Sequence, residues 1–179
     1  MISTADFALS VQNISKRYAG IQALDNVSID FRKGETHALV GENGAGKSTL
    51  IKIISGAEVP DSGRIQFEDQ TFEKMTPHLA QSVGVATIYQ EFNLIDVLSA
   101  AENICYGEKL GRFVNQKQMN KIAKEIFDDF GVDINPRTLV RDLTPGHMQI
   151  VEIAKAVSKK CRVLILDEPT APLSIAEVE

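Results

Sequence analysis

The residues best suited to chemistry are 41–49, which read Gly-Glu-Asn-Gly-Ala-Gly-Lys-Ser-Thr. They fit the pattern G-x-x-x-x-G-K-[S/T], in which a curled backbone cradles phosphate groups. The three glycines predict positive φ angles that let the loop curl, so that its N–H groups converge on phosphate oxygens. The lysine adds a positive charge, and the serine hydroxyl suits Mg²⁺. The sequence therefore predicts a phosphate-binding site formed by Gly41, Glu42, Asn43, Gly44, Ala45, Gly46, Lys47, Ser48 and Thr49.

Two elements must position this loop. The apolar run Thr36–Val40 predicts a buried strand before it, and Lys47–Ser55 predicts a helix after it. The helix N-terminus adds its positive dipole end to the phosphate site. The alternative is a glycine-rich turn between a strand and a helix that binds no ligand.

A pair of acids forms the second candidate site. Asp167 and Glu168 follow Val163–Leu166, an unbroken apolar run typical of a strand buried on both faces. A carboxylate at the end of such a strand needs a partner, and Mg²⁺ bound to phosphates would supply one. Glu168 could then orient or deprotonate an attacking water. The alternative is two carboxylates in a solvated loop.

The first part of the chain alternates short strands with helices. Polar and apolar residues alternate along Ala8–Ile14, where Leu9, Val11 and Asn13 are expected to share one face. The other predicted elements are the strands Val27–Phe31, Arg64–Phe67 and Val83–Ile88 and the helix Pro77–Ser82.

The segment from about 91 to 158 reads as helical. Ser99–Ile104 predicts one or two turns. The helical period is clearest in Gln116–Phe130, and Gly131 suits the position just past its end. A further helix begins at Thr144-Pro145 and runs to about Ser158, with Thr144 as N-cap. Its expected apolar face consists of Ile150, Val151, Ile153, Ala154 and Val157.

The bulk composition fits one globular domain. The chain has 179 residues, 44% of them hydrophobic, and a formal net charge of −5, so no basic surplus points to nucleic acid. Neither a secretory signal nor a membrane-spanning run is evident. Cys105 and Cys161 lack the spacing of metal ligands and are expected to be free thiols.

With these motifs in place, the chain resembles the ATP-binding subunits of ABC transporters. Within them it is most similar to the first nucleotide-binding half of the ATPases that power monosaccharide import. The resemblance covers nearly all of the chain and is carried by 16–24, 41–49, 88–91, 101–104, 149–156 and 164–171. It implies an α/β, P-loop NTPase domain of the ABC type spanning 1–179. A parallel core sheet, an antiparallel β subdomain and a helical subdomain at about 91–158 are expected, incomplete at the C-terminus.

The resemblance also gives residues their roles. Tyr18 matches the aromatic residue that stacks on adenine, and Gln90 matches the glutamine that reaches Mg²⁺ and the lytic water. ATP and Mg²⁺ are the implied cofactors. The implied catalytic residues are Glu168, Gln90 and Lys47. The implied metal ligands are Ser48, Gln90 and Asp167. Without the resemblance, Tyr18 would read as a half-buried tyrosine at a strand end and Gln90 as an ordinary loop amide.

The chain departs from the family pattern in three places. The signature loop Leu-Ser-Gly-Gly-Gln is here Leu143-Thr144-Pro145-Gly146-His147, in which proline removes one N–H donor. Ala171–Ser174 lacks the usual aspartate. Ser174–Glu177 has capping-box spacing, yet the chain stops two residues later. The family places one more core strand and a switch histidine beyond this point, so the sequence alone predicts poor hydrolysis by this chain.

The function implied by the resemblance is binding and hydrolysis of Mg-ATP to power sugar import. The expected partners are a second ATP-binding domain, a membrane permease and, indirectly, a periplasmic or extracellular sugar-binding protein. The expected location is cytoplasmic, peripheral on the inner face of the cell membrane, with no nucleic-acid partner. Two alternatives stay open: a nucleotide-binding module without turnover, and a soluble ABC-type ATPase that acts on nucleic acid or the ribosome.

Overall fold

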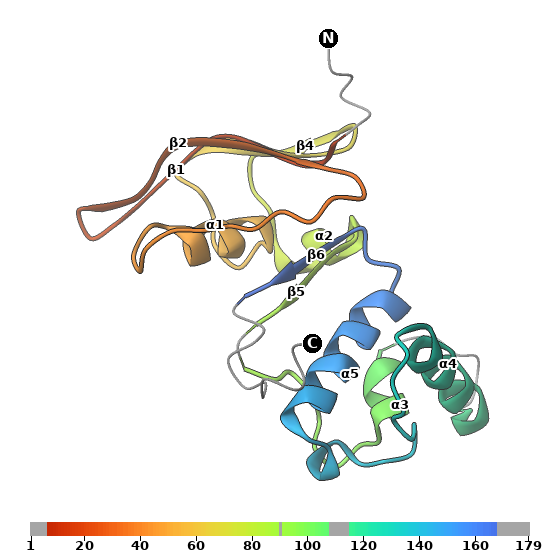
Figure 1. The fold of residues 1–179 in the computed structure, drawn as a ribbon. Helices are drawn as coiled ribbons and strands as arrows, with labels where there is room; N and C mark the ends of the chain where they lie inside the picture. The colour runs from red at the N-terminus through yellow and green to blue at the C-terminus, as the bar shows by residue number, and fades with distance from the viewer. Residues whose placement is uncertain (1–6, 90, 108–114, 168–179) are drawn as a thin grey trace. The chain divides into compact units, whose positions relative to one another are not determined.

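The computed structural model describes residues 7–89, 91–107 and 115–167 (Figure 1). The chain divides into two compact units, 1–86 and 87–179. No helix in the described part of the chain has both the length and the apolar character needed to cross a membrane.

An antiparallel sheet dominates the first unit. Its spatial order is β2-β1-β3-β4, so the two long N-terminal strands form a hairpin at one edge (Figure 1). The turn between them is Ala19-Gly20, where both residues have positive φ, at 44° and 92°, as tight hairpins require. The strands are β1 (Phe7–Tyr18), β2 (Ile21–Arg32), β3 (Ser62–Phe67) and β4 (Gln70–Phe72).

Strand β1 was correctly predicted, but its alternation breaks at Asn13. The ladders to β2 and β3 both shift register here, and Asn13 has a φ of 53°, which asparagine tolerates better than most residues. This β-bulge leaves Asn13 exposed and buries Ile14 completely. The expectation that Asn13 shares a face with Leu9 and Val11 is therefore wrong.

Helix α1 (Lys47–Ile54) supplies the other half of the first core. The helix was predicted from the sequence; its apolar residues are all buried, and it packs against β2. Helix α2 (Pro77–Ser82) begins at Thr76, whose hydroxyl accepts a hydrogen bond from the Leu79 N–H at 3.2 Å. The buried residues of α1 are Leu50, Ile51, Ile53 and Ile54.

The strand predicted at Thr36–Val40 is absent. These residues adopt no regular structure, and Val40 is 88% exposed. A strand is stable only when a neighbour completes its hydrogen bonds, and none of the described strands pairs with this segment. An apolar run alone therefore misled the prediction.

Three helices build the core of the second unit: α3 (Ala100–Ile104), α4 (Gln116–Asp129) and α5 (Pro145–Ser158). All three pack on one another, and a short 3₁₀ turn, η2 (Val140–Asp142), precedes α5. Phe127 is fully buried at this core. The core residues are Ala100, Ala101, Ile104, Cys105, Met119, Ala123, Phe127, Ile134, Val151 and Ala154.

Helix α4 ends as predicted at a left-handed glycine. Gly131 has a φ of 70°, and its N–H donates to the Asp128 carbonyl at 3.0 Å. The Val132 N–H donates to the Phe127 carbonyl at 3.0 Å, which completes a Schellman motif. Phe130 was expected on the apolar face, yet it is 39% exposed because it caps the helix.

The N-terminus of α3 carries a reciprocal capping box. The Ser99 N–H donates to Glu102 Oε2 at 2.8 Å, and the Glu102 N–H donates to the Ser99 hydroxyl at 3.3 Å. Hydrogen bonds from the Ser99 hydroxyl and N–H lower the pKa of Glu102, outweighing partial burial. The carboxylate form is therefore the one that stabilises the folded state.

Glu102→Gln is expected to lower the stability of the second unit at neutral pH by about 1 kcal/mol. Because the folded pKa of Glu102 is depressed, its contribution is present above the unfolded pKa and disappears as pH falls through the folded pKa. Urea denaturation from pH 7 to pH 3 should therefore show the variant and the parent converging in acid. Glu125→Gln, which breaks an exposed pair with Lys121, is the matched control. A difference that persists unchanged at pH 3 would contradict this account.

A second, two-stranded sheet joins β5 (Val85–Ile88), which spans the boundary of the units, to β6 (Val163–Leu166). The Asp167 N–H donates to the Ile88 carbonyl at 2.9 Å. The carboxyl ends of both strands therefore lie together, and the pairing is parallel. Strand β6 was correctly predicted, but the prediction that it is buried on both faces was wrong. Leu166 is 42% exposed, and among the described strands β6 pairs with β5 alone.

Candidate functional site

The phosphate-loop candidate is a turn that runs into the first turn of α1. Gly44 and Gly46 have φ angles of 85° and 87°, and the Ala45 N–H donates to the Glu42 carbonyl at 3.1 Å. The predicted positive φ is thus present at these two glycines and absent at Gly41. At Gly41 a side chain would instead meet Ala45, with the two Cβ atoms 3.2 Å apart.

Gly46 is required for packing as well as for its backbone angle. A Cβ atom here would lie 2.5 Å from the Ala23 carbonyl oxygen and 2.8 Å from Leu24 Cδ2. Both neighbours belong to β2. The glycine therefore lets the start of α1 approach the sheet, which fixes the direction in which the helix N-terminus points.

Lys47 lies at the first position of α1 and reaches back across the loop. Its ammonium donates to the Gly41 carbonyl at 2.7 Å and to the Glu42 carbonyl at 3.0 Å. The loop thus holds one cation at the positive end of a helix. Carbonyl oxygens and phosphate oxygens are both acceptors, so the same ammonium could exchange one set for the other.

Ser48 and Thr49 follow in the first turn of α1. Ser48 is exposed, and Thr49 is half-buried. The Thr49 hydroxyl lies close enough to Tyr18 to affect the pKa of its phenol. The structure therefore brings Tyr18, predicted to contact a base, next to the loop predicted to contact phosphates.

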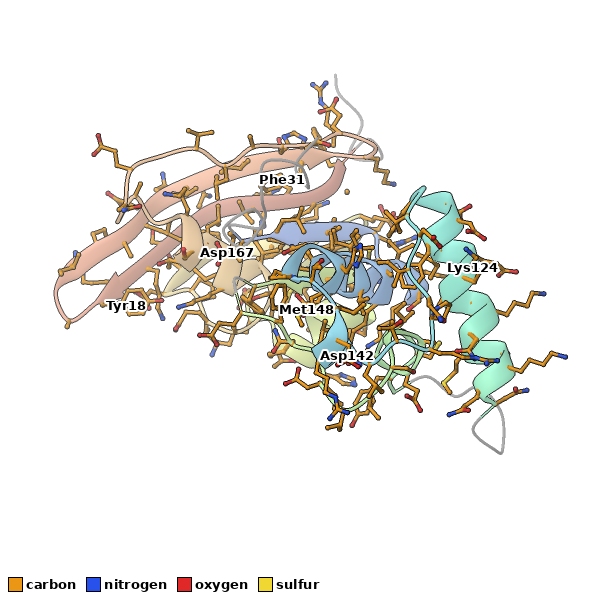
Figure 2. The ribbon with its side chains drawn as sticks, turned by 60° about the horizontal axis from the view of Figure 1, so that its bottom comes forward. Tyr18, Phe31, Lys124, Asp142, Met148 and Asp167 are labelled. Carbon is orange, nitrogen blue, oxygen red and sulfur yellow. The ribbon has the colours of Figure 1, made fainter. Side chains whose placement is uncertain are left out.

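Tyr18 ends β1 beside the hairpin turn (Figure 2). It is 37% exposed, and the Lys16 ammonium lies 5.3 Å from its ring centroid. Partial burial raises the pKa of the Tyr18 hydroxyl, and the nearby Glu58 carboxylate raises it further. The phenol is therefore neutral at physiological pH, as a stacking platform should be.

The acidic candidate begins directly after β6 at Asp167 (Figure 2). Its side chain is half-buried, and its N–H is bonded to Ile88 at the end of β5. The predicted residues Gln90 and Glu168 lie outside the described residues. The loop at 41–49 and Asp167 belong to different units.

The altered signature loop opens α5. Thr144 is the N-cap, as predicted, and its hydroxyl accepts a hydrogen bond from the His147 N–H at 3.2 Å. Pro145 takes the first helical position, and Gly146 is buried. Two backbone donors are therefore missing from this loop. Pro145 has no N–H group, and the N–H of His147 is already bonded to Thr144 in the helix cap.

A buried polar group on α5 was not predicted from the sequence. Glu152 is 6% exposed, and its Oε1 accepts a hydrogen bond from the Asn93 N–H at 2.6 Å. Lys155, one turn along, donates to the Asn93 carbonyl at 3.0 Å. Burial raises the pKa of Glu152, and Lys155 and the Asn93 bond oppose this. Two polar residues three apart on one helix face were the available signal.

The buried face of α5 therefore differs from the predicted apolar face. Gln149 and Glu152 are buried, whereas Val157 is 40% exposed. The polar side of the helix faces inward because Glu152 and Lys155 form hydrogen bonds with the N–H and the carbonyl of Asn93. Within the described ranges, Gln149 Nε2 and Glu152 Oε2 are buried without a hydrogen-bond partner.

The chain is similar to sugar-import proteins of bacteria. It is 48% identical to "Ribose import ATP-binding protein RbsA 1" of Streptomyces avermitilis, covering 99% of this chain and 34% of that protein. It is 47% identical to "Putative ribose/galactose/methyl galactoside import ATP-binding protein 3" of Burkholderia ambifaria, covering 95% and 34%. The chain thus spans about a third of the length of the curated relatives it matches.

Solved structures share the fold. The ADP conformation of MJ1267, an ATP-binding cassette of an ABC transporter, superposes with a TM-score of 0.80 at 26% identity, covering 96% of this chain and 72% of that one. A nucleotide-free ATP-binding cassette gives a TM-score of 0.79 at 25% identity, covering 96% and 73%. The predicted fold class is confirmed. The family model described as "ABC transporter" matches residues 24–171, and the chain therefore belongs to the ABC transporter family.

Proposed function

We propose that this chain binds Mg-ATP through residues 41–49 as the ATP-binding part of a sugar importer. One observation carries the proposal: a glycine-curled loop holds the Lys47 ammonium at the N-terminus of α1. A cation, the N–H groups of a curled loop and a helix dipole together favour a polyphosphate. The names of the two relatives support a sugar as the transported substrate, and the ADP conformation of MJ1267 supports an adenine nucleotide as the ligand.

Each predicted residue has a role in this proposal. Lys47 and the loop N–H groups hold the phosphates, while Tyr18 stacks on the adenine, a contact that tolerates different bases. Glu168 acts on the attacking water. Catalysis then consists chiefly of positioning and charge stabilisation. The residues proposed to bind the nucleotide are Tyr18, Gly41, Glu42, Asn43, Gly44, Ala45, Gly46, Lys47, Ser48 and Thr49.

The donors proposed for Mg²⁺ suit that ion. Ser48 offers an exposed hydroxyl and Asp167 a half-buried carboxylate, and Gln90 would add an amide oxygen. Oxygen donors are what Mg²⁺ prefers, with phosphate oxygens completing the shell. The described residues contain no group of three or more His, Cys, Asp or Glu side chains that could hold a metal ion. When bound, the ion would neutralise phosphate charge.

The proposed assembly pairs this chain with a second ATP-binding domain beneath a membrane permease, with a sugar-binding protein on the other side. The chain would then lie on the inner face of the membrane. Residues 91–158 would serve as the helical subdomain within this single domain.

A second candidate is nucleotide binding without turnover by this chain alone. The signature loop favours this second candidate because it offers fewer backbone N–H donors for a phosphate. Pro145 has no N–H group, and the His147 N–H donates to the Thr144 hydroxyl. Turnover by purified 1–179 comparable to that of a full-length homologue, abolished by Glu168→Gln, would contradict this candidate. ATP binding with no phosphate release would support it.

Lys47→Ala is expected to weaken ATP binding by at least about tenfold, because it removes a charge-assisted contact to phosphate. Calorimetric titration of purified 1–179 with Mg-ATP measures the loss. Lys52→Ala is the matched control, since Lys52 is an exposed lysine in the last turn of the same helix. Equal affinity in the parent chain and Lys47→Ala would contradict the proposed site.

A further inference from the structure

A polar cluster made of Lys16, Glu58 and Thr49 lies beside Tyr18. The Lys16 ammonium lies over the phenol ring at 5.3 Å from its centroid. The Glu58 carboxylate and the Thr49 hydroxyl are both close enough to the Tyr18 hydroxyl to shift its pKa, one upward and the other downward.

Lys16 is fixed in place by the segment that follows α1. Its ammonium lies 2.8 Å from Glu58 Oε1 and 3.6 Å from Asp61 Oδ1, and it donates to the Val59 carbonyl at 2.6 Å. Its side chain is only 12% exposed. The hydrogen bond to Glu58 raises the pKa of Lys16, and the same bond lowers the pKa of Glu58. Both groups are therefore charged at neutral pH.

Backbone contacts hold the two segments together. The Arg17 N–H donates to Asp61 Oδ2 at 2.7 Å, and the Asp61 N–H donates to the Ser15 carbonyl at 2.9 Å. The end of β1 is thus tied to residues 58–61 on both sides of Lys16. The geometry leaves Lys16 few alternative positions, and it occupies one face of the Tyr18 ring.

We infer that Glu58 is a positioning residue for the base of the bound nucleotide. It anchors Lys16 on one face of the ring, so the ring presents its opposite face in a fixed orientation. A platform ordered in advance saves the entropy of ordering it on binding. The inference rests on the proposed function, because it concerns the base end of the same nucleotide.

The test compares Mg-ATP with inorganic tripolyphosphate, which has the phosphates but no base, by calorimetric titration of purified 1–179. Glu58→Ala is expected to weaken ATP binding roughly threefold to tenfold and to change tripolyphosphate binding less than about twofold. Glu58→Gln keeps an oxygen that can accept a hydrogen bond from Lys16 but loses the negative charge, so its loss of ATP affinity should be intermediate.

The matched control is Glu68→Ala. Glu68 is a glutamate of the same unit with the same exposed fraction, 33% against 32%, and it is paired with Lys33 at 3.1 Å. This control should leave both affinities unchanged. Unchanged ATP affinity in Glu58→Ala overturns the inference, and so does an equal loss for ATP and tripolyphosphate, because Glu58 would then support the loop and not the base. A parent chain that binds neither ligand overturns the proposed function, and the inference with it.

Discussion

Gly46→Ala is expected to destabilise the first unit by about 2–5 kcal/mol and to remove nucleotide binding with it. The backbone at this position has a φ of 87°, which an alanine adopts only with strain. The added Cβ would also lie 2.5 Å from the Ala23 carbonyl oxygen, a backbone atom that no side-chain rotation can move aside. Either α1 moves away from β2, or the loop changes shape.

Gly44→Ala separates the two causes. Gly44 has nearly the same φ, 85°, but no atom outside its neighbours lies within 4 Å of its would-be Cβ. Its substitution should cost only the backbone strain, about 1–2 kcal/mol. Urea denaturation of both variants, followed by far-ultraviolet circular dichroism, gives the difference. Equal losses would show that the clash with β2 has no energetic weight, which contradicts the packing described for α1.

Phe127→Ala is expected to destabilise the second unit by about 3–5 kcal/mol. Phe127 is fully buried in the core that α3, α4 and α5 share, and its truncation leaves a cavity that these helices can fill only by shifting toward one another. Its carbonyl also accepts the Val132 hydrogen bond that ends α4. Hydrogen exchange of residues 116–134 should therefore accelerate throughout, and the urea midpoint should fall.

Phe130→Ala is the matched control for this prediction. It makes the same chemical change three residues further along, at a side chain that is 39% exposed. Its expected cost is less than about 1 kcal/mol. A loss in Phe130→Ala as large as that in Phe127→Ala would contradict the placement of the core on the Phe127 side of α4.

Local signals in the sequence predicted the helices well. Thr144 and Gly131 mark helix ends through bonds made within a few residues, so their positions depend little on the rest of the fold. The segment Thr36–Val40 failed for the opposite reason. A strand requires a partner from elsewhere in the chain, and apolar composition does not say whether one is available.

The candidate site was predictable in its residue types and less so in its contacts. The loop at 41–49 and the acid after β6 follow from motifs with a fixed spelling. The contacts of Lys47 with Gly41 and Glu42, and the ion pair of Lys16 with Glu58, depend on how separate segments of the chain meet. The bulge at Asn13 and the buried Glu152 likewise arise from tertiary contacts, which override local patterns.

Hydrogen exchange of the loop amides with and without Mg-ATP tests the central claim most directly. If the backbone at 41–49 cradles phosphates, the amides of residues 42–49 should exchange more slowly when Mg-ATP is added, because they gain acceptors. This protection should disappear in Lys47→Ala and persist in Lys52→Ala. Exchange in the loop that does not change when Mg-ATP is added at saturating concentration would contradict the account.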